Sequence, residues 1–418
     1  MPRGADFPIP DVIELTIAAL GAKGDGIAHH QGRDYFVPLA APGDRVHVVA
    51  GAERREGTEA RIERLIAPGP DRVEPPCRHF GDCGGCALQH LSDAFYARWK
   101  AARLTEALAA HGIVCAIEGM ASAPIASRRR ARFGVAAGAI GFRRRFSHAI
   151  VDIPDCTILR PALHETLRAL RKRKAFPEGE FELLETEGGI DLKLSRGESS
   201  NPGWRRRQAA LAEELDLVRL SLRGQDSAEV IVERREPWLD FGGVAVVPPP
   251  GGFVQPTREG EIALRAAVLE GVSGARRVVD LFAGCGTFAL PLARDRQVHA
   301  VDMDAAALAA LDRAGRKAGL VRLSQEKRDL FRRPLARDEL KPFDTAIFDP
   351  PRAGAPAQAK ALAQSRVACV VAVSCNPATL ARDLGYLVAG GYRIERVVPY
   401  DQFRFTPHLE TVAVLRRG

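Results

Sequence analysis

From residue 277 onwards, short apolar segments alternate with stretches of helical periodicity. The apolar segments are rich in β-branched residues and lie at 277–281, 298–302, 345–349, 369–374 and 412–415. Strands that alternate with helices fold into a parallel sheet, because each helix carries the chain back to the start of the next strand. We therefore predict an α/β fold with a doubly wound sheet over residues 248–418, which begin with a Pro-Pro-Pro-Gly-Gly run.

The residues before 248 fall into stretches of different pattern. Short alternating segments broken by Gly and Pro, at 12–17, 34–39, 45–50 and 59–66, predict a small β-barrel over 1–68. Residues 73–90 are dense in Cys, Gly and Pro, which is typical of a loop. Helical stretches at 94–111 and 161–174, with strand-like runs at 127–158 and 181–232, predict an α+β central domain over 93–247. We group the loop at 69–92 with the central strands of 127–160.

The net charge of +8 comes largely from arginine clusters at 128–132, 143–145, 171–174 and 205–207. Such clusters suit either a polyanionic partner or a solvated surface, and charge does not choose between them. No run of eighteen apolar residues occurs, and the N-terminal residues lack the apolar core of a secretory signal. We expect a cytoplasmic protein with no membrane segment. Its eight cysteines are then metal ligands, nucleophiles or core residues rather than disulfides.

A glycine turn follows the first strand of the predicted sheet. Gly284 and Gly286 lack side chains, so a ligand can approach the backbone between this strand and the next helix. Asp302 ends the following strand, where its carboxylate can accept hydrogen bonds from ribose hydroxyls. Residues 288–290 supply no third glycine of the dinucleotide fingerprint. The pattern predicts a Rossmann-like domain that binds S-adenosylmethionine rather than NAD.

Asp349 ends another predicted strand and is followed by Pro350, Pro351 and Arg352. Two prolines stiffen this loop at the carboxyl end of the sheet, where open α/β folds bind their ligands. Methyltransferases that act on exocyclic amines usually have an aromatic residue where Arg352 stands. The sequence therefore disfavours an amine as the methyl acceptor.

Cys375 follows an apolar strand and precedes the turn Asn376-Pro377. A thiol at a strand tip has the exposure that a nucleophile needs, although a cysteine in such a context alone is more often a core residue. Carbon 5 of uracil is a poor nucleophile, and addition of a thiolate at carbon 6 makes it an enolate carbon that can take a methyl group. A base must then remove the carbon 5 proton, and Glu410 is a carboxylate candidate.

Three further thiols, Cys77, Cys83 and Cys86, lie within ten residues, and Cys156 is available as a fourth. Four thiolates suit an iron–sulfur cluster or a structural zinc, and the spacing does not distinguish the two. We assign Cys115, Cys285 and Cys369 to packing.

Segments 349–352, 374–383 and 408–412 together resemble the bacterial RNA 5-methyluridine methyltransferases, and the resemblance extends over most of the chain. It implies that Cys375 is the nucleophile and that Glu410 takes the carbon 5 proton. It also implies that S-adenosylmethionine contacts Gln255, Phe282, Asp302 and Asp349, with Asp329 near the adenine, and Gly284 of the glycine turn is a further cofactor-site candidate. The family often has Asn where Thr257 stands and Glu where Asp302 stands.

The same resemblance bears on the cysteines and the barrel. The arrangement of Cys77, Cys83, Cys86 and Cys156 is similar to the [4Fe-4S] site of the ribosomal members of the family. Residues 24–28 and 37–44 resemble the TRAM module, an RNA-binding barrel. Barrel and cluster together favour 23S rRNA over tRNA as the substrate, and we expect the protein to be a monomer.

Three alternatives stay open at this point. One is a tRNA uridine C5-methyltransferase, and another is an RNA cytosine C5-methyltransferase, which usually carries a cysteine just after the Asp-x-Pro turn, whereas 352–355 contain none. The third is an RNA-binding iron–sulfur protein that keeps the methyltransferase fold without catalysis. In that protein Cys375 would be dispensable.

Overall fold

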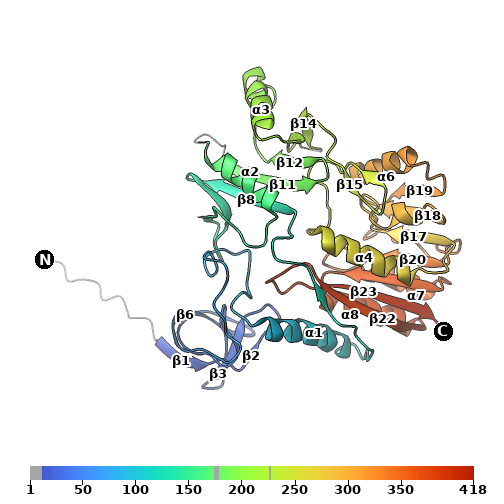
Figure 1. Cartoon of the computed structure of the whole chain (residues 1–418). Coiled ribbons are helices and arrows are strands. Elements are labelled where there is room, and N and C mark those ends of the chain that lie inside the picture. The colour runs from blue at the N-terminus through green and yellow to red at the C-terminus, as the bar shows by residue number, and fades with distance from the viewer. Residues whose placement is uncertain (1–11, 174–177, 226) are drawn as a thin grey trace. The chain divides into compact units, whose positions relative to one another are not determined.

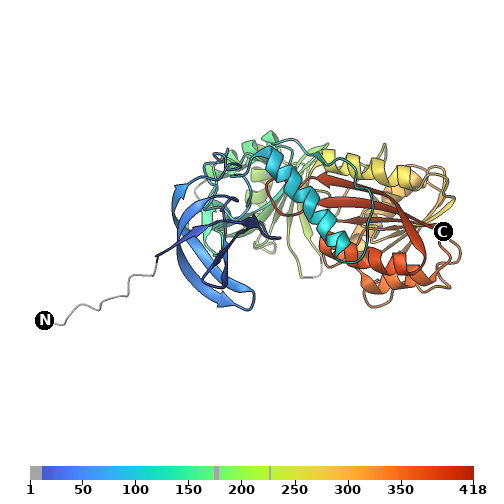
Figure 2. The same ribbon diagram turned by 90° about the horizontal axis from the view of Figure 1, so that it is seen from below.

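The computed structural model describes residues 12–173, 178–225 and 227–418 (Figures 1 and 2). The first eleven residues of the expected barrel, and Lys174 at the end of an expected helix, lie outside the described residues. The chain forms two compact units, Met1–Lys100 with Phe405–Pro407 and Ala101–Arg404 with His408–Gly418.

The first unit contains a six-stranded sheet in the order β1-β5-β6-β4-β3-β2, antiparallel except for the β4–β6 pair. Alternating apolar residues such as Leu15, Val37 and Val46 point into its core and are almost fully buried. This strand-rich sheet is consistent with the expected OB-like barrel. Its strands are β1 Val12–Thr16, β2 Ala19–Leu20, β3 Gly26–His30, β4 Arg33–Val37, β5 Arg45–Arg54 and β6 Gly57–Ala67.

Asp44 ties the barrel to the chain that leaves it. Its buried carboxylate accepts hydrogen bonds from the main-chain N–H groups of Ala41 (2.6 Å) and Gly69 (2.8 Å) and from the Arg72 guanidinium (2.6 Å). Burial alone would raise the pKa of Asp44, but these bonds outweigh it and lower the pKa. The start of the Cys-rich loop is thereby fixed against the barrel.

The second unit contains a seven-stranded sheet in the order β10-β9-β8-β11-β12-β13-β14, with helix α2 packed on it through Leu163, Leu167 and Leu170. The expectation that residues 181–232 are strand-like throughout was wrong, because helix α3 interrupts them. Asn201 begins α3 by accepting hydrogen bonds from the N–H groups of Gly203 and Trp204, a capping signal that outweighs the flanking strand pattern. The elements are β8 Arg130–Ala136, β9 Ala139–Arg143, β10 Ile150–Asp152, α2 Pro161–Arg171, β11 Gly179–Thr186, β12 Gly189–Leu194, α3 Pro202–Glu214, β13 Arg219–Leu222 and β14 Glu229–Glu233.

The same unit contains an eight-stranded sheet in the order β19-β18-β17-β20-β21-β23-β22-β7. The first five strands are parallel, as expected, but β23 runs antiparallel to both β21 and β22, so the sheet is not parallel throughout. The strands are β7 Ala121–Ser122, β17 Arg277–Leu281, β18 Gln297–Asp302, β19 Leu323–Lys327, β20 Thr345–Phe348, β21 Cys369–Ser374, β22 Tyr392–Asp401 and β23 Glu410–Arg417. A short hairpin, β15 Leu239–Asp240 and β16 Ala245–Val246, precedes them.

Helices cover both faces of this sheet (Figures 1 and 2). Helices α4, α5 and α6 pack on the face that carries Val278 and Val371, whereas α7, α8 and part of α1 pack on the face that carries Val279 and Val370. Apolar residues on both sides of each central strand are therefore buried, which explains their continuous apolar runs. The helices are α1 Asp93–Ala109, α4 Arg258–Gly271, α5 Ala289–Leu292, α6 Ala305–Lys317, α7 Pro356–Gln364 and α8 Pro377–Ala389.

Across residues 12–173, 178–225 and 227–418, none of the helices combines the length and the apolar character needed to span a membrane.

Candidate active site

The expected site residues gather at the carboxyl ends of the central strands. Leu281 of β17 pairs with Val301 of β18 and with Phe348 of β20, so Phe282, Asp302 and Asp349 each leave the same edge of the sheet. β21 continues this edge, since Ala372 pairs with Phe348 and Cys375 follows the strand directly. Parallel pairing therefore brings together residues that lie far apart in the sequence.

Phe282 makes the turn that follows β17. Its φ of 66° lies in the left-handed region, which is unusual for a residue with a side chain. Two hydrogen bonds to the Val301 carbonyl, from the N–H groups of Phe282 (2.9 Å) and Ala283 (3.1 Å), hold this conformation. The ring lies against Phe331 and Phe348, with centroids 5.4 and 6.1 Å away. The strained turn gives this edge of the sheet an aromatic wall.

Asp302 holds the glycine turn with its side chain. One carboxylate oxygen accepts the N–H of Gly284 and the other that of Asp304, each at 2.8 Å. A carboxylate has about four lone-pair positions, so two stay available for ribose hydroxyls. The shorter Asp therefore fits this position, where the family often has Glu.

Four carboxylates gather behind this edge. Asp280 is completely buried, and its carboxylate lies near the Ala289 N–H without a hydrogen bond of ordinary geometry to any described residue. Burial and the neighbouring Asp302 raise the pKa of Asp280 to about 8. Burial, with repulsion from Glu410, Asp280 and Asp302, raises the pKa of Asp349 well above its usual range. Placing these carboxylates close together destabilises their ionised forms in the protein alone, and a cation bound between them would stabilise those forms.

Cys375 lies between β21 and α8, half-buried. Burial and the nearby Glu410 and Asp349 raise the pKa of the Cys375 thiol to about 11, although Arg352 opposes the shift. At neutral pH only roughly one such thiol in ten thousand is ionised. The turn is rigid, because Asn376 caps α8 through the N–H of Ala378 (3.2 Å) and donates to the Arg352 carbonyl (3.2 Å).

Glu410 reaches this edge through the antiparallel strand β23. Ser374 pairs with Thr411, so the residue before Thr411 lies beside the residue after Ser374. Glu410 is 4% exposed, and burial raises its pKa to about 7 despite a hydrogen bond from Gln402. A carboxylate with this pKa can both accept and release a proton at neutral pH.

Gln402 connects the carboxylate to the expected cofactor contact. Its Nε2 donates to Glu410 Oε2 (3.0 Å) and to Gln255 Oε1 (2.8 Å), and all three side chains are buried. Its own Oε1 has no partner among the described residues. Gln402 therefore fixes the positions of both neighbours.

A buried ion pair supports Gln255 from behind. Arg129 Nε donates to the Gln255 carbonyl (3.1 Å), and its guanidinium pairs with Glu261 (2.5 Å), which also binds Arg265 (2.9 Å). Thr257 caps α4 by accepting the N–H of Gly260 (3.0 Å). Thr257 is therefore the N-cap of α4, at a position where the family often has Asn.

Asp329 and the cysteines complete the set of expected residues. Asp329 accepts the N–H groups of Phe331 (3.0 Å) and Arg332 (3.2 Å), which shapes the loop carrying Phe331. All eight cysteines lie within the described residues, and none of them forms a disulfide. Cys77, Cys83 and Cys86 belong to one compact unit and Cys156 to the other. In the described part of the chain, no group of three or more His, Cys, Asp or Glu side chains is arranged as metal ligands.

Known proteins share this fold and sequence. Residues 249–418 match the family model for tRNA (uracil-5-)-methyltransferase. The chain is 46% identical to an uncharacterized RNA methyltransferase of Brucella suis, over 97% of this chain and 98% of that protein. It is 35% identical to the 23S rRNA (uracil(1939)-C(5))-methyltransferase of Chromohalobacter salexigens, over 96% and 89%. The chain belongs to the RNA uracil-C5-methyltransferase family.

The fold of this RNA uracil-C5-methyltransferase also matches a solved structure. The Pyrococcus abyssi tRNA (uracil-54, C5)-methyltransferase, in complex with S-adenosyl-L-homocysteine, has a TM-score of 0.76 at 24% identity and covers 96% of this chain and 99% of that one. Both units of the methyltransferase therefore have counterparts in one known fold.

The sequence did not indicate every residue that builds this methyltransferase's site. Gln402 stands in an Asp-Gln-Phe segment without a motif of its own, and its role comes from the β22–β23 pairing that brings Tyr400 opposite Glu410. Arg129 was seen only as one member of an arginine cluster. Asp280 lies within an otherwise apolar strand, and an acid in such a strand is the one sequence feature that could have indicated a buried carboxylate near the site.

The unpaired carboxyl of Asp280 predicts a stability that depends on pH. Its folded pKa of about 8 exceeds the ordinary 3.8, so its ionisation opposes folding more strongly as pH rises from 4 to 8. Asp280→Asn removes this penalty. We expect an unfolding temperature about 2–5 °C above wild type at pH 9, corresponding to roughly 1–3 kcal/mol, and a difference that shrinks toward pH 4.

The matched control is Asp295→Asn, since the Asp295 side chain is 71% exposed. Thermal unfolding followed by circular dichroism measures both variants across pH. A difference between Asp280→Asn and wild type that does not change with pH would contradict the assigned cost.

Proposed function

We propose that the protein transfers a methyl group from S-adenosylmethionine to carbon 5 of a uridine in RNA, with Cys375 as the covalent nucleophile and Glu410 as the base. The observation that supports this most is the β21–β23 pairing, which brings a carboxylate with a pKa of about 7 next to a thiol at a strand end. C5 methylation of uracil requires this combination of groups.

The residues at the strand tips suit S-adenosylmethionine. Burial and neighbouring carboxylates disfavour the ionised forms of Asp280 and Asp349, and a positively charged ligand beside them would favour those forms. When bound, S-adenosylmethionine supplies the methyl group on a sulfonium cation, whose charge offsets the carboxylates. The residues proposed to hold it are Gln255, Phe282, Gly284, Asp302, Asp329 and Asp349.

Cys375 begins the proposed reaction. The thiolate forms a bond to carbon 6 of the uracil, and the electrons of the 5,6 double bond move onto carbon 5 and oxygen 4. Carbon 5 then takes the methyl group. Glu410 removes the proton left on carbon 5, the double bond re-forms, and the bond between sulfur and carbon 6 breaks. Reaching both carbons requires that the base be turned out of its helix.

The thiol must lose its proton before it attacks. With a pKa of about 11 it is protonated in the free protein, because the thiol is partly buried and because Glu410 and Asp349 repel a nearby negative charge. A cation among these carboxylates weakens that repulsion. We therefore expect the Cys375 thiol to be more reactive when the positively charged S-adenosylmethionine is bound than when the site is empty.

For the RNA substrate we propose 23S rRNA. Two relatives that are 35–36% identical over 96% of this chain are named 23S rRNA (uracil(1939)-C(5))-methyltransferases. The tRNA alternative has the name of the family model and of the solved neighbour in its favour. Mapping 5-methyluridine in the rRNA and tRNA of a deletion strain distinguishes them. Action on ribosomal RNA fits a monomeric protein of the cytoplasm.

We also propose that the N-terminal barrel is a TRAM module that contacts the RNA and that Cys77, Cys83, Cys86 and Cys156 hold a [4Fe-4S] cluster. The donor set fits such a cluster in its chemistry, because the four thiols form no disulfide and the N–H of Gly85 donates to Cys83 Sγ (3.4 Å). Hydrogen bonds to sulfur are a feature of cluster sites. The thiols would hold the loop at 69–92, and methyl transfer does not require them.

The roles of the two catalytic groups predict a trapped intermediate. In Glu410→Gln, addition of Cys375 and methyl transfer still occur, but the carbon 5 proton stays in place. The RNA should then remain attached to the protein and carry labelled methyl, seen as a slow band on a denaturing gel. Turnover should fall by roughly 10²–10⁴-fold, the range for loss of a general base.

The double variant Cys375→Ala with Glu410→Gln is the control and should give no attached RNA. Wild-type turnover by Glu410→Gln would contradict the role of Glu410 as the base, and attached RNA in the double variant would contradict the role of Cys375 as the nucleophile.

The cluster has its own test. Anaerobically purified protein should show broad absorbance near ~400 nm and contain iron and sulfide. Cys83→Ala should lose both, whereas Cys115→Ala, at a half-buried cysteine outside the set, should keep them. Zinc in place of iron, with no such absorbance, would refute the cluster.

A further inference from the structure

A groove lies at the end of the eight-stranded sheet opposite the candidate active site. Two depressions, of about 460 and 530 Å³, share Arg277, Gln297 and Arg322 as lining residues and are therefore continuous. These residues stand at the amino ends of β17, β18 and β19, whereas Phe282 and Asp302 mark the carboxyl ends. We call these two depressions the amino-end groove.

The outer part of the amino-end groove is rich in positive charge. Arg276, Arg277, Arg296 and Arg322 line it. The main-chain N–H groups of Arg276 and Arg277 are both held by Asp344, and both exposed guanidinium groups lack a hydrogen bond or ion pair within the described residues. Arg322 donates only to the main-chain carbonyl of Asp295 (2.7 Å).

Three carboxylates line the groove, fewer than its four arginines. In the outer part, Asp295 lies 3.7 Å from Arg296 and offsets one of the four positive charges. Glu326 and Glu339 both bind Arg328, at 2.7 and 2.5 Å. The hydrogen bond from Arg328 lowers the pKa of Glu339 to about 2, so the two groups stay an ion pair at neutral pH. The guanidinium groups of the outer part therefore present a net positive surface.

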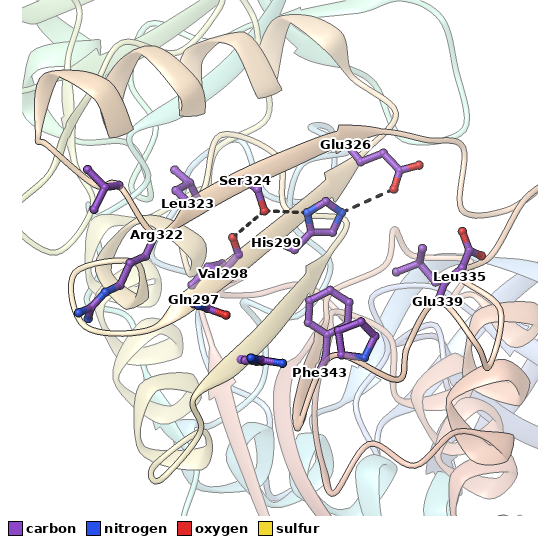
Figure 3. Close-up of a pocket in the computed structure, with 13 residues that line it drawn as sticks. Gln297, Val298, His299, Arg322, Leu323, Ser324, Glu326, Leu335, Glu339 and Phe343 are labelled. Atoms are coloured by element: carbon purple, nitrogen blue, oxygen red, sulfur yellow. Dashed lines mark hydrogen bonds and ion pairs between the residues drawn. The ribbon is translucent and has the colours of Figure 1, made fainter.

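The inner part of the groove has an aromatic wall (Figure 3). His299 on β18 and Phe343 stack nearly in parallel, with centroids 5.9 Å apart and planes 16° apart. The imidazole is fixed by Ser324 Oγ (2.9 Å) and lies 3.6 Å from Glu326. Figure 3 shows these polar side chains on two neighbouring strands above the Phe343 ring. Flat rings beside hydrogen-bonding groups are what a nucleobase requires.

We propose that the amino-end groove binds a single-stranded segment of the RNA substrate, with phosphates on Arg277 and Arg322 and a base against Phe343 and His299. The proposal rests on the RNA substrate of the proposed function and adds a second contact point on it. Arginine guanidinium groups bind phosphate in forked pairs of hydrogen bonds, and such contacts position RNA without reading its sequence.

The outermost strand of the sheet, β19, runs from the amino-end groove toward the candidate active site at the carboxyl ends of the strands. β19 is the edge strand, with Arg322 before its first residue and Lys327 as its last, both exposed. At a rise of about 3.3 Å per residue, its five residues span roughly 16 Å. A stacked strand has a phosphate about every 3.4 Å, so roughly five nucleotides would connect the groove with the uridine at the active site.

The salt dependence of RNA binding tests the groove. The full-length protein binds a fluorescein-labelled single-stranded RNA, and anisotropy gives the affinity at several salt concentrations. For Arg277→Gln with Arg322→Gln we expect roughly tenfold weaker binding, and a slope of log K against log salt that is smaller by about 1.4, or 0.7 for each lost phosphate contact. Phe343→Leu should weaken binding by roughly tenfold with the slope unchanged, because stacking carries no charge.

Arg316→Gln is the matched control. It removes an exposed arginine of α6, on the other face of the sheet, and should leave affinity and slope as in wild type. A double variant with the slope of this control would overturn the proposal, whatever its overall affinity. Methylation takes no part in the assay, so an inactive but RNA-binding wild type would refute the proposed function alone.

Discussion

Four carboxylates at the carboxyl ends of the parallel strands, two buried and two half-buried, set the properties of this protein. Burial raises the pKa values of Asp280, Asp349 and Glu410, because it removes the water that would stabilise their charge, and repulsion from Asp302 adds to the shift of Asp280 and Asp349. Burial, with repulsion from Glu410 and Asp349, keeps the thiol of Cys375 protonated. A folded chain keeps such an arrangement at a cost in stability, and a positively charged ligand is the simplest means of relieving it.

The geometry of this edge depends on a change of strand direction. Five parallel strands bring the cofactor-site residues together, and antiparallel β23 then adds Glu410 beside Cys375. Gln402, directly after β22, completes the network by donating to both Glu410 and Gln255. The β21–β23 pairing holds nucleophile and base together, and a shift of one residue in the β22–β23 register would move Gln402 away from Glu410.

The sequence predicted the parts of this site that local pattern encodes. Strands β17 and β21 have the expected bounds, since their apolar runs are buried on both faces. It missed β19, whose five residues Leu-Ser-Gln-Glu-Lys are mostly polar because the strand lies at the sheet edge. The direction of β23 and the role of Gln402 depend on pairing between distant segments, and no residue pattern along the chain records that pairing.

We propose different roles for the two ends of the eight-stranded sheet, with catalysis at the carboxyl end and RNA binding at the amino end. The carboxyl end holds the groups proposed for chemistry, and the amino end holds arginines and aromatic rings without a catalytic arrangement. Net positive charge alone did not distinguish an RNA-binding protein from one with a solvated surface. The local balance favours RNA binding, because four arginines line the groove against three acids, and the side chains of Arg276 and Arg277 have no acidic partner among the described residues.

The covalent role of Cys375 is the central claim, and peptide mapping of a trapped complex tests it most directly. RNA with fluorine at carbon 5 of the uridine lacks the proton that Glu410 removes, so the proposed adduct cannot be released. Mass spectrometry of the digested complex should find the methylated nucleotide on the peptide that contains Cys375. A nucleotide on any other residue, or no attached nucleotide under conditions in which wild type methylates ordinary RNA, would contradict the account.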